Sequence, residues 1–255
     1  MPLQFPNNSS VFVQGASEGI GLAFVKNFLK DERIKKVIAS SRNPQDSVLS
    51  DLILEHPKKL EIYNLDLENQ SSINDCADQI LKFNHELDCL LNVSGLLHSD
   101  LIKPEKRVSD LNIDNLNKIF SVNTFGPIIL TSKLLPLLKG RTHSIIANIS
   151  ARVGSIEDNR SGGWHSYRSS KAALNMLTKN LAIELSRNKK FNTLCVALHP
   201  GTVDTELSKP FSKNTEPSNL FTPKESAENL LKVISSLSIE DSGNFFDWSG
   251  KKIPW

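Results

Sequence analysis

The sequence predicts an α/β domain in which a doubly wound parallel sheet of about seven strands carries helices on both faces. Short apolar runs of strand length alternate with longer segments of helical period, and no internal repeat or linker interrupts the alternation. The 255 residues are enough for one domain with a large core, which we expect to span residues 1–255. Because parallel strands need a crossover, usually a helix, this order is typical of a sheet covered on both faces.

The expected elements follow in a regular order. The strand-like runs are Val11 to Gln14, Lys36 to Ser40, Leu60 to Asn64, Asp88 to Val93, His143 to Ile149, Thr193 to His199 and Asn244 to Phe246. Helices are expected to start near Gly19, Asp46, Ser71, Asn112, Phe125, Trp164 and Lys224. The segment from Trp164 to Arg187 has the clearest helical period, because its leucines at 174, 177, 181 and 185 fall on one stripe.

Composition and charge exclude several classes of protein. The 30 Lys and Arg residues against 28 Asp and Glu leave a formal charge of +2, too small and too scattered for a nucleic-acid surface. No segment approaches the run of about 18 apolar residues that spans a membrane, and the N-terminus lacks a secretion signal. Cys76, Cys89 and Cys195 form no metal or disulfide pattern. We therefore expect a cytoplasmic protein with reduced thiols and no nucleic-acid or membrane partner.

A glycine-rich turn follows the first expected strand and reads GASEGIG across residues 15–21. Gly15 can take the backbone through a tight turn, while Gly19 and Gly21 let a pyrophosphate and the sheet approach the helix start without a clashing Cβ. Free N–H groups and the helix dipole favour phosphates at that place. The pattern predicts a dinucleotide site, with a purely structural strand-to-helix turn as the alternative.

The second expected strand ends in Ser40, Ser41 and Arg42, where a dinucleotide fold meets the adenosine ribose. An acidic residue at this position would accept the 2′-hydroxyl of NAD, whereas two hydroxyls and a guanidinium suit a 2′-phosphate. This interpretation prefers NADP(H) over NAD(H). A solvated loop arginine is the alternative.

Tyr167 and Lys171 are four positions apart in the clearest helix, so their side chains share a face. We expect the ammonium, together with an oxidised nicotinamide, to lower the pKa of Tyr167 from about 10 toward roughly 7. Such a phenol can donate a proton to a carbonyl oxygen while hydride reaches the carbon, or accept it in reverse. A solvated pair formed by chance is the alternative.

Taken together, the motifs resemble the short-chain dehydrogenase/reductase family over nearly the whole chain. Asp66 is similar to the family's adenine-contacting aspartate, and Asn92-Val93-Ser94-Gly95 to its Asn-Asn-Ala-Gly strand end. The segment Pro200 to Thr205 resembles the Pro-Gly segment that contacts the nicotinamide. Three further stretches look most like the C-factor and sniffer-type carbonyl reductase branch: Arg152 to Ser155, Ser161 to Trp164, and Phe246 to Trp255. The resemblance implies a Rossmann-type fold.

The resemblance also implies four catalytic residues. Tyr167 is the general acid/base, and Lys171 both tunes its pKa and binds the nicotinamide ribose. Ser150 hydrogen-bonds the substrate oxygen, and Asn123 holds a water in a proton relay behind Lys171. From the residues alone, Ser150 could be a strand-end hydroxyl and Asn123 a helix-kink or capping residue. The residues expected to contact the coenzyme are Gly15, Ser17, Gly19, Ile20, Gly21, Ser41, Arg42, Asp66, Leu67, Asn92, Ser94, Gly95, Lys171, Pro200, Gly201, Val203 and Thr205.

The sequence departs from the family pattern at three places. Gln14 replaces the usual threonine before the glycine turn, and Val93 replaces the second Asn of the strand end, which we expect to weaken local hydrogen bonding. Ser150 and Tyr167 are seventeen positions apart, several more than the family usually has, so the loop Ile156 to Gly163 is enlarged beside the substrate position.

The substrate side is predicted only in outline. We expect residues 201–221 to form a lid, because a long segment without clear period follows the end of a strand. Val153, Trp164 and Phe211 are candidate pocket walls that could equally be core. His98, His165 and His199 lack metal-ligand spacing, so we expect structural or surface histidines and no metal.

The sequence therefore predicts an NADPH-dependent reductase of a ketone or aldehyde, which works reversibly as an alcohol dehydrogenase. The alternative is a non-catalytic NADP(H)-binding signalling or sensor protein of the C-factor type, since a fold does not fix a function. The intact pair of Tyr167 and Lys171 argues against that alternative. By resemblance we expect a small-molecule carbonyl or alcohol substrate and a homodimer or homotetramer.

Overall fold

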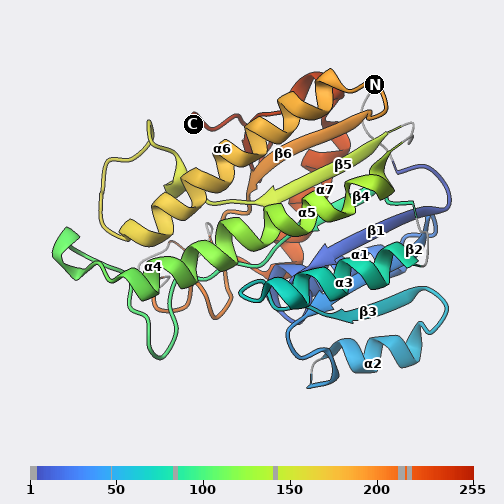
Figure 1. The fold of residues 1–255 in the computed structure, drawn as a ribbon, viewed down its shortest axis with the longest axis horizontal. Helices are drawn as coiled ribbons and strands as arrows, with labels where there is room; N and C mark the ends of the chain where they lie inside the picture. The colour runs from blue at the N-terminus through green and yellow to red at the C-terminus, as the bar shows by residue number, and fades with distance from the viewer. Residues whose placement is uncertain (1–4, 47, 83–85, 140–142, 212–215, 217–219) are drawn as a thin grey trace.

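A parallel sheet with helices on both faces forms the centre of the protein (Figure 1). The computed structural model describes residues 5–46, 48–82, 86–139, 143–211, 216 and 220–255. Within these residues the sheet has seven strands in the order β3-β2-β1-β4-β5-β6-β9, and every neighbouring pair is parallel. The strands are β1 Ser9–Gln14, β2 Ile34–Ser41, β3 Leu60–Asn64, β4 Cys89–Asn92, β5 Ser144–Ile149, β6 Thr193–His199 and β9 Phe245–Asp247. The expected α/β class and its seven strands are confirmed.

The helices start within three residues of their expected positions. They are α1 Gly19–Lys30, α2 Val48–Glu55, α3 Gln70–Lys82, α4 Ile113–Phe120, α5 Gly126–Leu138, α6 His165–Arg187 and α7 Pro223–Ser236. The helix expected near Asp46 begins at Val48, because a short 3₁₀ turn, Pro44–Asp46, comes first. None of the helices in these described ranges is long and apolar enough to span a membrane.

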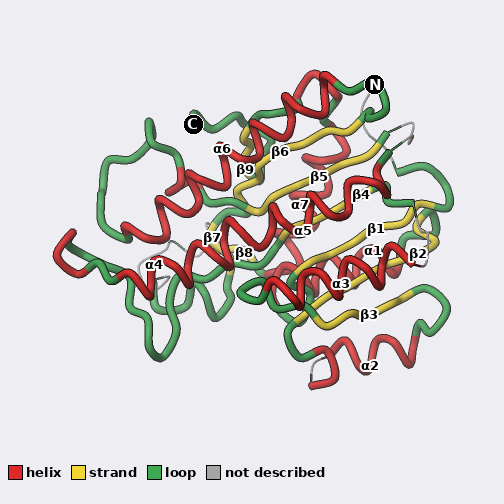
Figure 2. Tube along the Cα trace, viewed as in Figure 1, coloured by secondary structure: helices red, strands yellow, loops and turns green. Residues whose placement is uncertain are grey.

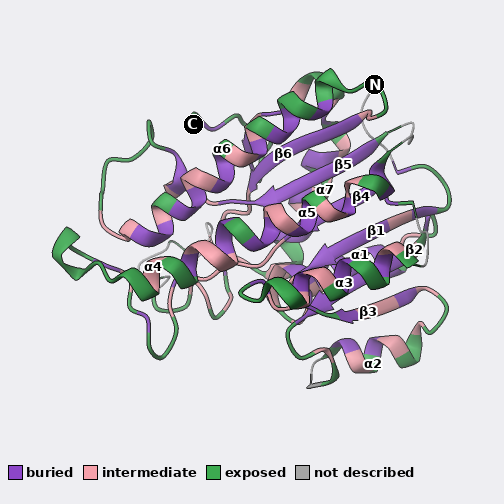
Figure 3. Cartoon of the chain, in the orientation of Figure 1, coloured by how far each residue is buried: buried purple, intermediate pink, exposed green. Residues whose placement is uncertain are grey.

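The two faces of the sheet are packed separately. Val11 and Val13 of β1 belong to one core cluster with side chains of α1, α2 and α7, while Phe12 between them belongs to another with side chains of α3, α5 and α6. Since both faces are covered, β4 and β5 are buried along their length, and β1 and β6 are buried except for one residue each (Figure 3). This explains why they appear in the sequence as continuous apolar runs.

The order of the strands changes direction at β1. From β1 the chain builds outward through β2 and β3, then returns to the other side of β1 and continues through β4, β5 and β6. Ligands of such sheets bind in the crevice outside the carboxyl ends of the strands at this reversal. The fold therefore directs attention to the segments that follow β1 and β4.

The expected lid, residues 201–221, is bounded by a second small sheet. Its strands β7 Thr202–Val203 and β8 Leu220–Phe221 are parallel to each other and lie at the same end of the molecule as the carboxyl ends of the main strands (Figure 2). Residues 212–215 and 217–219 of the expected lid lie outside the described part of the chain.

Candidate active site

A cavity of about 610 Å³ lies where the fold predicts it, across the segments that follow β1, β2, β3 and β4. Its wall includes twelve of the residues that the sequence assigns to a coenzyme: Gly15, Ser17, Gly19, Ile20, Gly21, Ser41, Arg42, Asp66, Leu67, Ser94, Gly95 and Thr205. Five others, Asn92, Lys171, Pro200, Gly201 and Val203, are outside its lining. The volume is within the range of about 300–1,000 Å³ that is typical of small-molecule and cofactor sites.

The glycine turn forms one wall of this cavity. Gly15 and Gly19 have φ values of +82° and +53°, which favour glycine. A Cβ atom on Gly15 would lie 2.8 Å from the backbone nitrogen of Ser94, and one on Gly21 would overlap the backbone carbonyl of Gly15. Glu18, the N-cap of α1, makes no side-chain capping bond, so the first N–H groups of the helix stay available to an anion.

Gln14 makes more hydrogen bonds than its replacement of the usual threonine suggested. Its Nε2 donates a 2.6 Å hydrogen bond to the hydroxyl of Ser94, and its Oε1 accepts one of 3.2 Å from the Ser94 backbone N–H. This amide ties the end of β1 to the segment after β4. The expected weakening of local hydrogen bonding is therefore wrong at Gln14, because the longer side chain reaches across the switch point.

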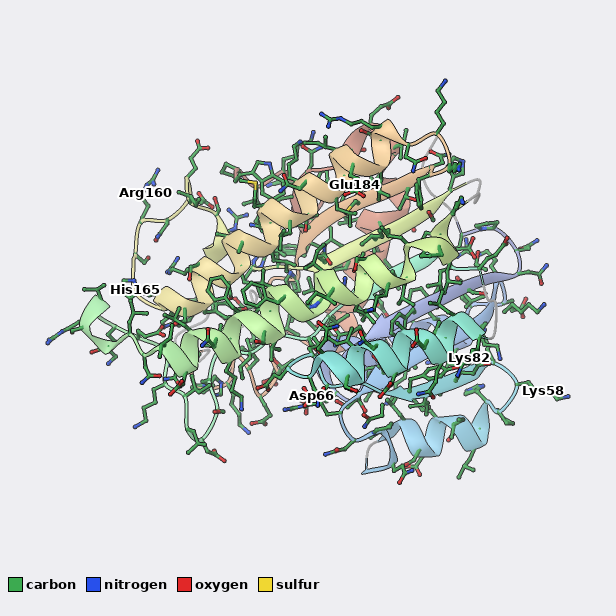
Figure 4. The ribbon with its side chains drawn as sticks, viewed as in Figure 1. Lys58, Asp66, Lys82, Arg160, His165 and Glu184 are labelled. Atoms are coloured by element: carbon green, nitrogen blue, oxygen red, sulfur yellow. The ribbon has the colours of Figure 1, made fainter. Side chains whose placement is uncertain are left out.

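The far end of the cavity contains Ser41 and Arg42. Ser41 is buried, and its hydroxyl, like that of Ser40, has no hydrogen-bond partner among the described residues. Asp66 also lines this end of the cavity, beside the start of α3 (Figure 4). Its Oδ1 accepts a 2.9 Å bond from the backbone of Glu68, which fixes the turn that carries it. One unpaired hydroxyl, that of Ser41, and the Arg42 side chain thus line the same part of the cavity.

Asn92 has a different environment from that expected. It is buried, and its Nδ2 donates to Thr131 Oγ1 at 3.0 Å and to Asn148 Oδ1 at 2.7 Å. The amide therefore links β4 to α5 and β5 inside the core. Its backbone, not its side chain, continues toward the cavity at Val93 and Ser94.

The pair of Tyr167 and Lys171 lies one turn apart on α6, as the spacing predicts, and both side chains are buried. Lys171 Nζ is 5.9 Å from the centre of the Tyr167 ring and donates a 2.9 Å hydrogen bond to the backbone oxygen of Ile149. A Cβ atom on Gly95 would be 3.6 Å from that Nζ and 3.8 Å from Asn123 Oδ1. The ammonium and the amide therefore lie directly behind Gly95, at the edge of the cavity.

Burial controls the protonation of this pair. It raises the pKa of the Tyr167 hydroxyl above its usual value and lowers the pKa of the Lys171 ammonium from 10.5 to about 8. The expected lowering of the Tyr167 pKa concerned the site with an oxidised nicotinamide bound and stays a prediction, whereas in the chain by itself burial acts in the opposite direction. The ammonium is engaged by Ile149, and at its distance from the ring it does not offset the lost hydration of a phenolate. Tyr167 is a neutral phenol at neutral pH, and its hydroxyl has no partner among the described residues.

Ser150 lies at the end of β5 and is buried. Its hydroxyl donates a 2.6 Å hydrogen bond to Oδ1 of Asn175, a residue that the sequence reasoning missed. Asn175 follows Lys171 by four positions, as Lys171 follows Tyr167, so one face of α6 carries all three side chains. Continuing the same spacing by one step along the helix would have found it.

Asn123 lies in a π-helix, Ser121–Phe125, that joins α4 to α5. Its Oδ1 accepts a 2.7 Å bond from the backbone N–H of Leu96, and its Nδ2 donates to the oxygen of Leu96 at 2.9 Å and to Ser170 Oγ at 3.0 Å. The widened turn directs this amide at the segment after β4. Asn123 thus occupies a helix irregularity, as the interpretation from the residues alone expected. Its Oδ1 also lies behind Gly95 together with Lys171 Nζ, as the proton relay implied by the resemblance requires.

Trp164 joins Tyr167 to a row of aromatic side chains. Its ring packs edge-on at 6.4 Å from Tyr167 and at 4.7 Å from Phe211. Phe211 in turn contacts His98, whose Nε2 is 3.1 Å from the backbone oxygens of Glu206 and Leu207. Of the three candidate pocket walls, Trp164 therefore contacts Tyr167 directly, Phe211 lies behind Trp164, and Val153 is half-buried.

Gly201 and His199 are held by packing and burial rather than exposed to the cavity. A Cβ atom on Gly201 would meet the Phe221 ring at 2.7 Å and Trp248 at 3.1 Å, so its neighbours require glycine there. His199 has its pKa lowered to about 4 by burial and by the charge of Arg152, which keeps it neutral. The described ranges contain no group of three or more side chains suited to a metal ion.

Comparison with known proteins agrees with this arrangement. The pattern of the family described as short chain dehydrogenase matches residues 9–216. C-signal of Myxococcus xanthus is 36% identical over 58% of this chain and 83% of its own length. NADPH-bound carbonyl reductase from chicken fatty liver has a TM-score of 0.83 and 31% identity, and covers 98% of this chain and 100% of its own. Carbonyl reductase Sniffer of D. melanogaster has the same TM-score and coverage at 28% identity. The chain therefore belongs to the short-chain dehydrogenase family, on the branch of C-signal and the Sniffer-type carbonyl reductases, and is an oxidoreductase.

Proposed function

We propose that this protein is an NADPH-dependent carbonyl reductase that converts a ketone or aldehyde to the alcohol, and the alcohol back, with Tyr167 as general acid/base. One observation carries the proposal. The free, neutral phenol of Tyr167 is buried one helical turn from Lys171, whose ammonium lies at the edge of a dinucleotide-sized cavity.

The residues that line the cavity fit a nicotinamide dinucleotide. The uncapped start of α1 suits the pyrophosphate, and Asp66 suits the adenine end. The unpartnered, buried hydroxyl of Ser41 lines the cavity together with Arg42, and a 2′-phosphate would satisfy it, which supports NADPH over NADH. When bound, the reduced nicotinamide supplies the hydride.

The side chains divide the remaining work. Tyr167 donates its proton to the carbonyl oxygen, a role that its raised pKa favours in the direction of reduction. Ser150 turns from Asn175 to donate a second hydrogen bond to the same oxygen as charge develops there. Lys171 stabilises the phenolate that remains and returns a proton to it, and is itself reprotonated from the side of Asn123.

The test follows NADPH absorbance with a panel of aliphatic and aromatic ketones and aldehydes, wild type beside Tyr167→Phe. The phenylalanine fills the same space without the proton, so we expect kcat to fall by about 10²–10⁴-fold with NADPH affinity unchanged.

The second candidate function, which the similarity to C-signal supports, is that of a non-catalytic sensor. Such a protein would bind NADPH but would turn over no compound of the panel. Equal turnover by wild type and Tyr167→Phe would refute the role of the phenol.

A further inference from the structure

A buried carboxylate outside the cavity holds the helix that carries Tyr167. Glu105 lies in the segment between β4 and α4, and only 4% of it is exposed. Its Oε2 accepts a 3.2 Å hydrogen bond from the backbone N–H of Ser166, and its Oε1 accepts the Ser166 hydroxyl. No cation of the described ranges forms an ion pair with it. The positive end of the α6 dipole is therefore what compensates its charge.

The backbone at this helix start is unusual. Gly162, Gly163 and Trp164 have successive φ values of +61°, +64° and +48°, and the last is not a glycine. A left-handed backbone conformation costs free energy at a residue with a large side chain, so contacts around Trp164 must stabilise it. The Trp164 side chain makes no capping bond to α6. Its backbone N–H instead donates a 2.5 Å hydrogen bond to the backbone oxygen of Glu105.

Glu105 thus acts as the cap of α6 from a segment about sixty residues away in the sequence. Both its carboxylate and its backbone oxygen bind the first turn, at Ser166 and Trp164. A Cβ atom on Gly163 would lie only 3.4 Å from the Glu105 oxygen, which shows how closely the two segments approach. An apolar residue at position 105 would leave the Ser166 N–H and hydroxyl unpaired inside the protein, whereas the Trp164 N–H would keep its backbone acceptor.

The phenol depends on the same contacts. Tyr167 immediately follows Ser166, and the ring of Trp164 packs edge-on against the Tyr167 ring. The Tyr167 backbone oxygen accepts a 2.8 Å hydrogen bond from Ser170, which Asn123 also contacts. Trp164 therefore packs against the ring, and Ser170 binds the backbone that carries it. We propose that Glu105 is a positioning residue that fixes the first turn of α6 and so aims the Tyr167 hydroxyl, an inference that rests on the proposed role of Tyr167.

The experiment compares Glu105→Gln and Glu105→Ala with a control, Glu184→Gln. The control removes the same charge from an exposed position near the other end of α6, as Figure 4 shows for its side chain and for His165 at the helix start. We expect kcat to fall by about 100-fold in the alanine variant, because misplacement by about 1 Å has that effect, and by about tenfold in the glutamine variant, which keeps one acceptor. NADPH affinity should stay within about twofold, since the cavity does not include Glu105.

A spectroscopic readout separates positioning from loss of fold. The chain has only two tyrosines, so in a Tyr63→Phe background Tyr167 is the sole tyrosine. With ¹³C-labelled tyrosine we expect one sharp ring resonance in the parent, a shifted one in Glu105→Gln, and a broadened or doubled one in Glu105→Ala at unchanged circular dichroism.

An unchanged ring resonance overturns the inference, as does a loss of activity that only parallels the loss of folded protein. The resonance needs no turnover. A fully active Tyr167→Phe enzyme would therefore defeat the proposed function, whereas an unmoved ring in Glu105→Ala would defeat only the positioning role.

Discussion

The two halves of the candidate site are built in different ways. The coenzyme half consists mainly of backbone and small side chains that immediately follow single strands, such as Gly15, Ser41 and Ser94. The substrate half is assembled from side chains of separate segments, with Trp164 against Tyr167 and Phe211, and Glu105 beneath them. A local motif therefore encodes the first half, whereas the second exists only after the chain has folded.

This difference also divides the physical chemistry. The coenzyme half offers unpaired donors, the free N–H groups of α1 and the hydroxyl of Ser41. In the substrate half most polar groups already bind each other, as Ser150 does Asn175 and Lys171 does Ile149. Binding should thus be robust to changes on the substrate side, and turnover should be sensitive to them.

The largest expected effect is that of Lys171→Met. Without the ammonium the phenolate is unsupported, so we expect kcat to fall by about 10²–10⁴-fold. The free energy of unfolding, by contrast, should increase. Since the folded protein holds the Lys171 pKa at about 8 rather than 10.5, the buried cation destabilises the fold at pH 7. After the lost bond to Ile149 is included, we expect a gain of about 2 kcal/mol in the free energy of unfolding.

Chemical denaturation against pH measures this balance. The unfolded wild type binds more protons than the folded protein between pH 8 and 10.5, so the Lys171 contribution to stability should rise across that window and be missing in Lys171→Met. Lys189→Met, which changes an exposed lysine just beyond α6, is the matched control. A destabilised Lys171→Met protein would contradict the expectation.

Arg42→Ala tests the coenzyme half of the site, at the place where Ser41 and Arg42 line the cavity. If the guanidinium pairs with a 2′-phosphate, the loss of a charge-assisted hydrogen bond should weaken NADPH binding by about tenfold or more and leave NADH binding nearly unchanged. Titration of the two coenzymes by fluorescence gives both constants, with Arg187→Ala as a charge-matched control on an exposed site. Equal losses for the two coenzymes would refute the 2′-phosphate role.

The smallest effect is expected from Asn175→Ala. The Ser150 hydroxyl loses the acceptor that orients it, so kcat should fall by about fivefold while NADPH affinity is retained. In a double-mutant cycle with Ser150→Ala, the two losses should not add, because both act through one hydroxyl. Additive losses would mean that Asn175 does not act through Ser150.

The sequence predicted the elements well, and twelve of the seventeen residues expected to contact a coenzyme line one cavity, because these signals are local. The glycine turn follows a strand, and Tyr167 and Lys171 have helical spacing, so position alone puts them together. Glu105 gave no such signal, since its partners at Trp164 and Ser166 become neighbours only through tertiary folding. The burial that raises the Tyr167 pKa in the chain by itself gave no sequence signal for the same reason, because burial depends on packing from several segments.

The π-helix Ser121–Phe125 has a consequence for how this chain tolerates insertions and deletions. One extra residue in a helical path rotates everything after it by about 100° about the axis, and here it sets the phase between α4 and α5. Deleting a single residue would restore a continuous helix, yet it would turn Asn123 away from Leu96 or α5 away from the sheet. The π-helix therefore sets the rotation of α5 relative to α4, so that Asn123 can contact Leu96 while α5 packs on the sheet.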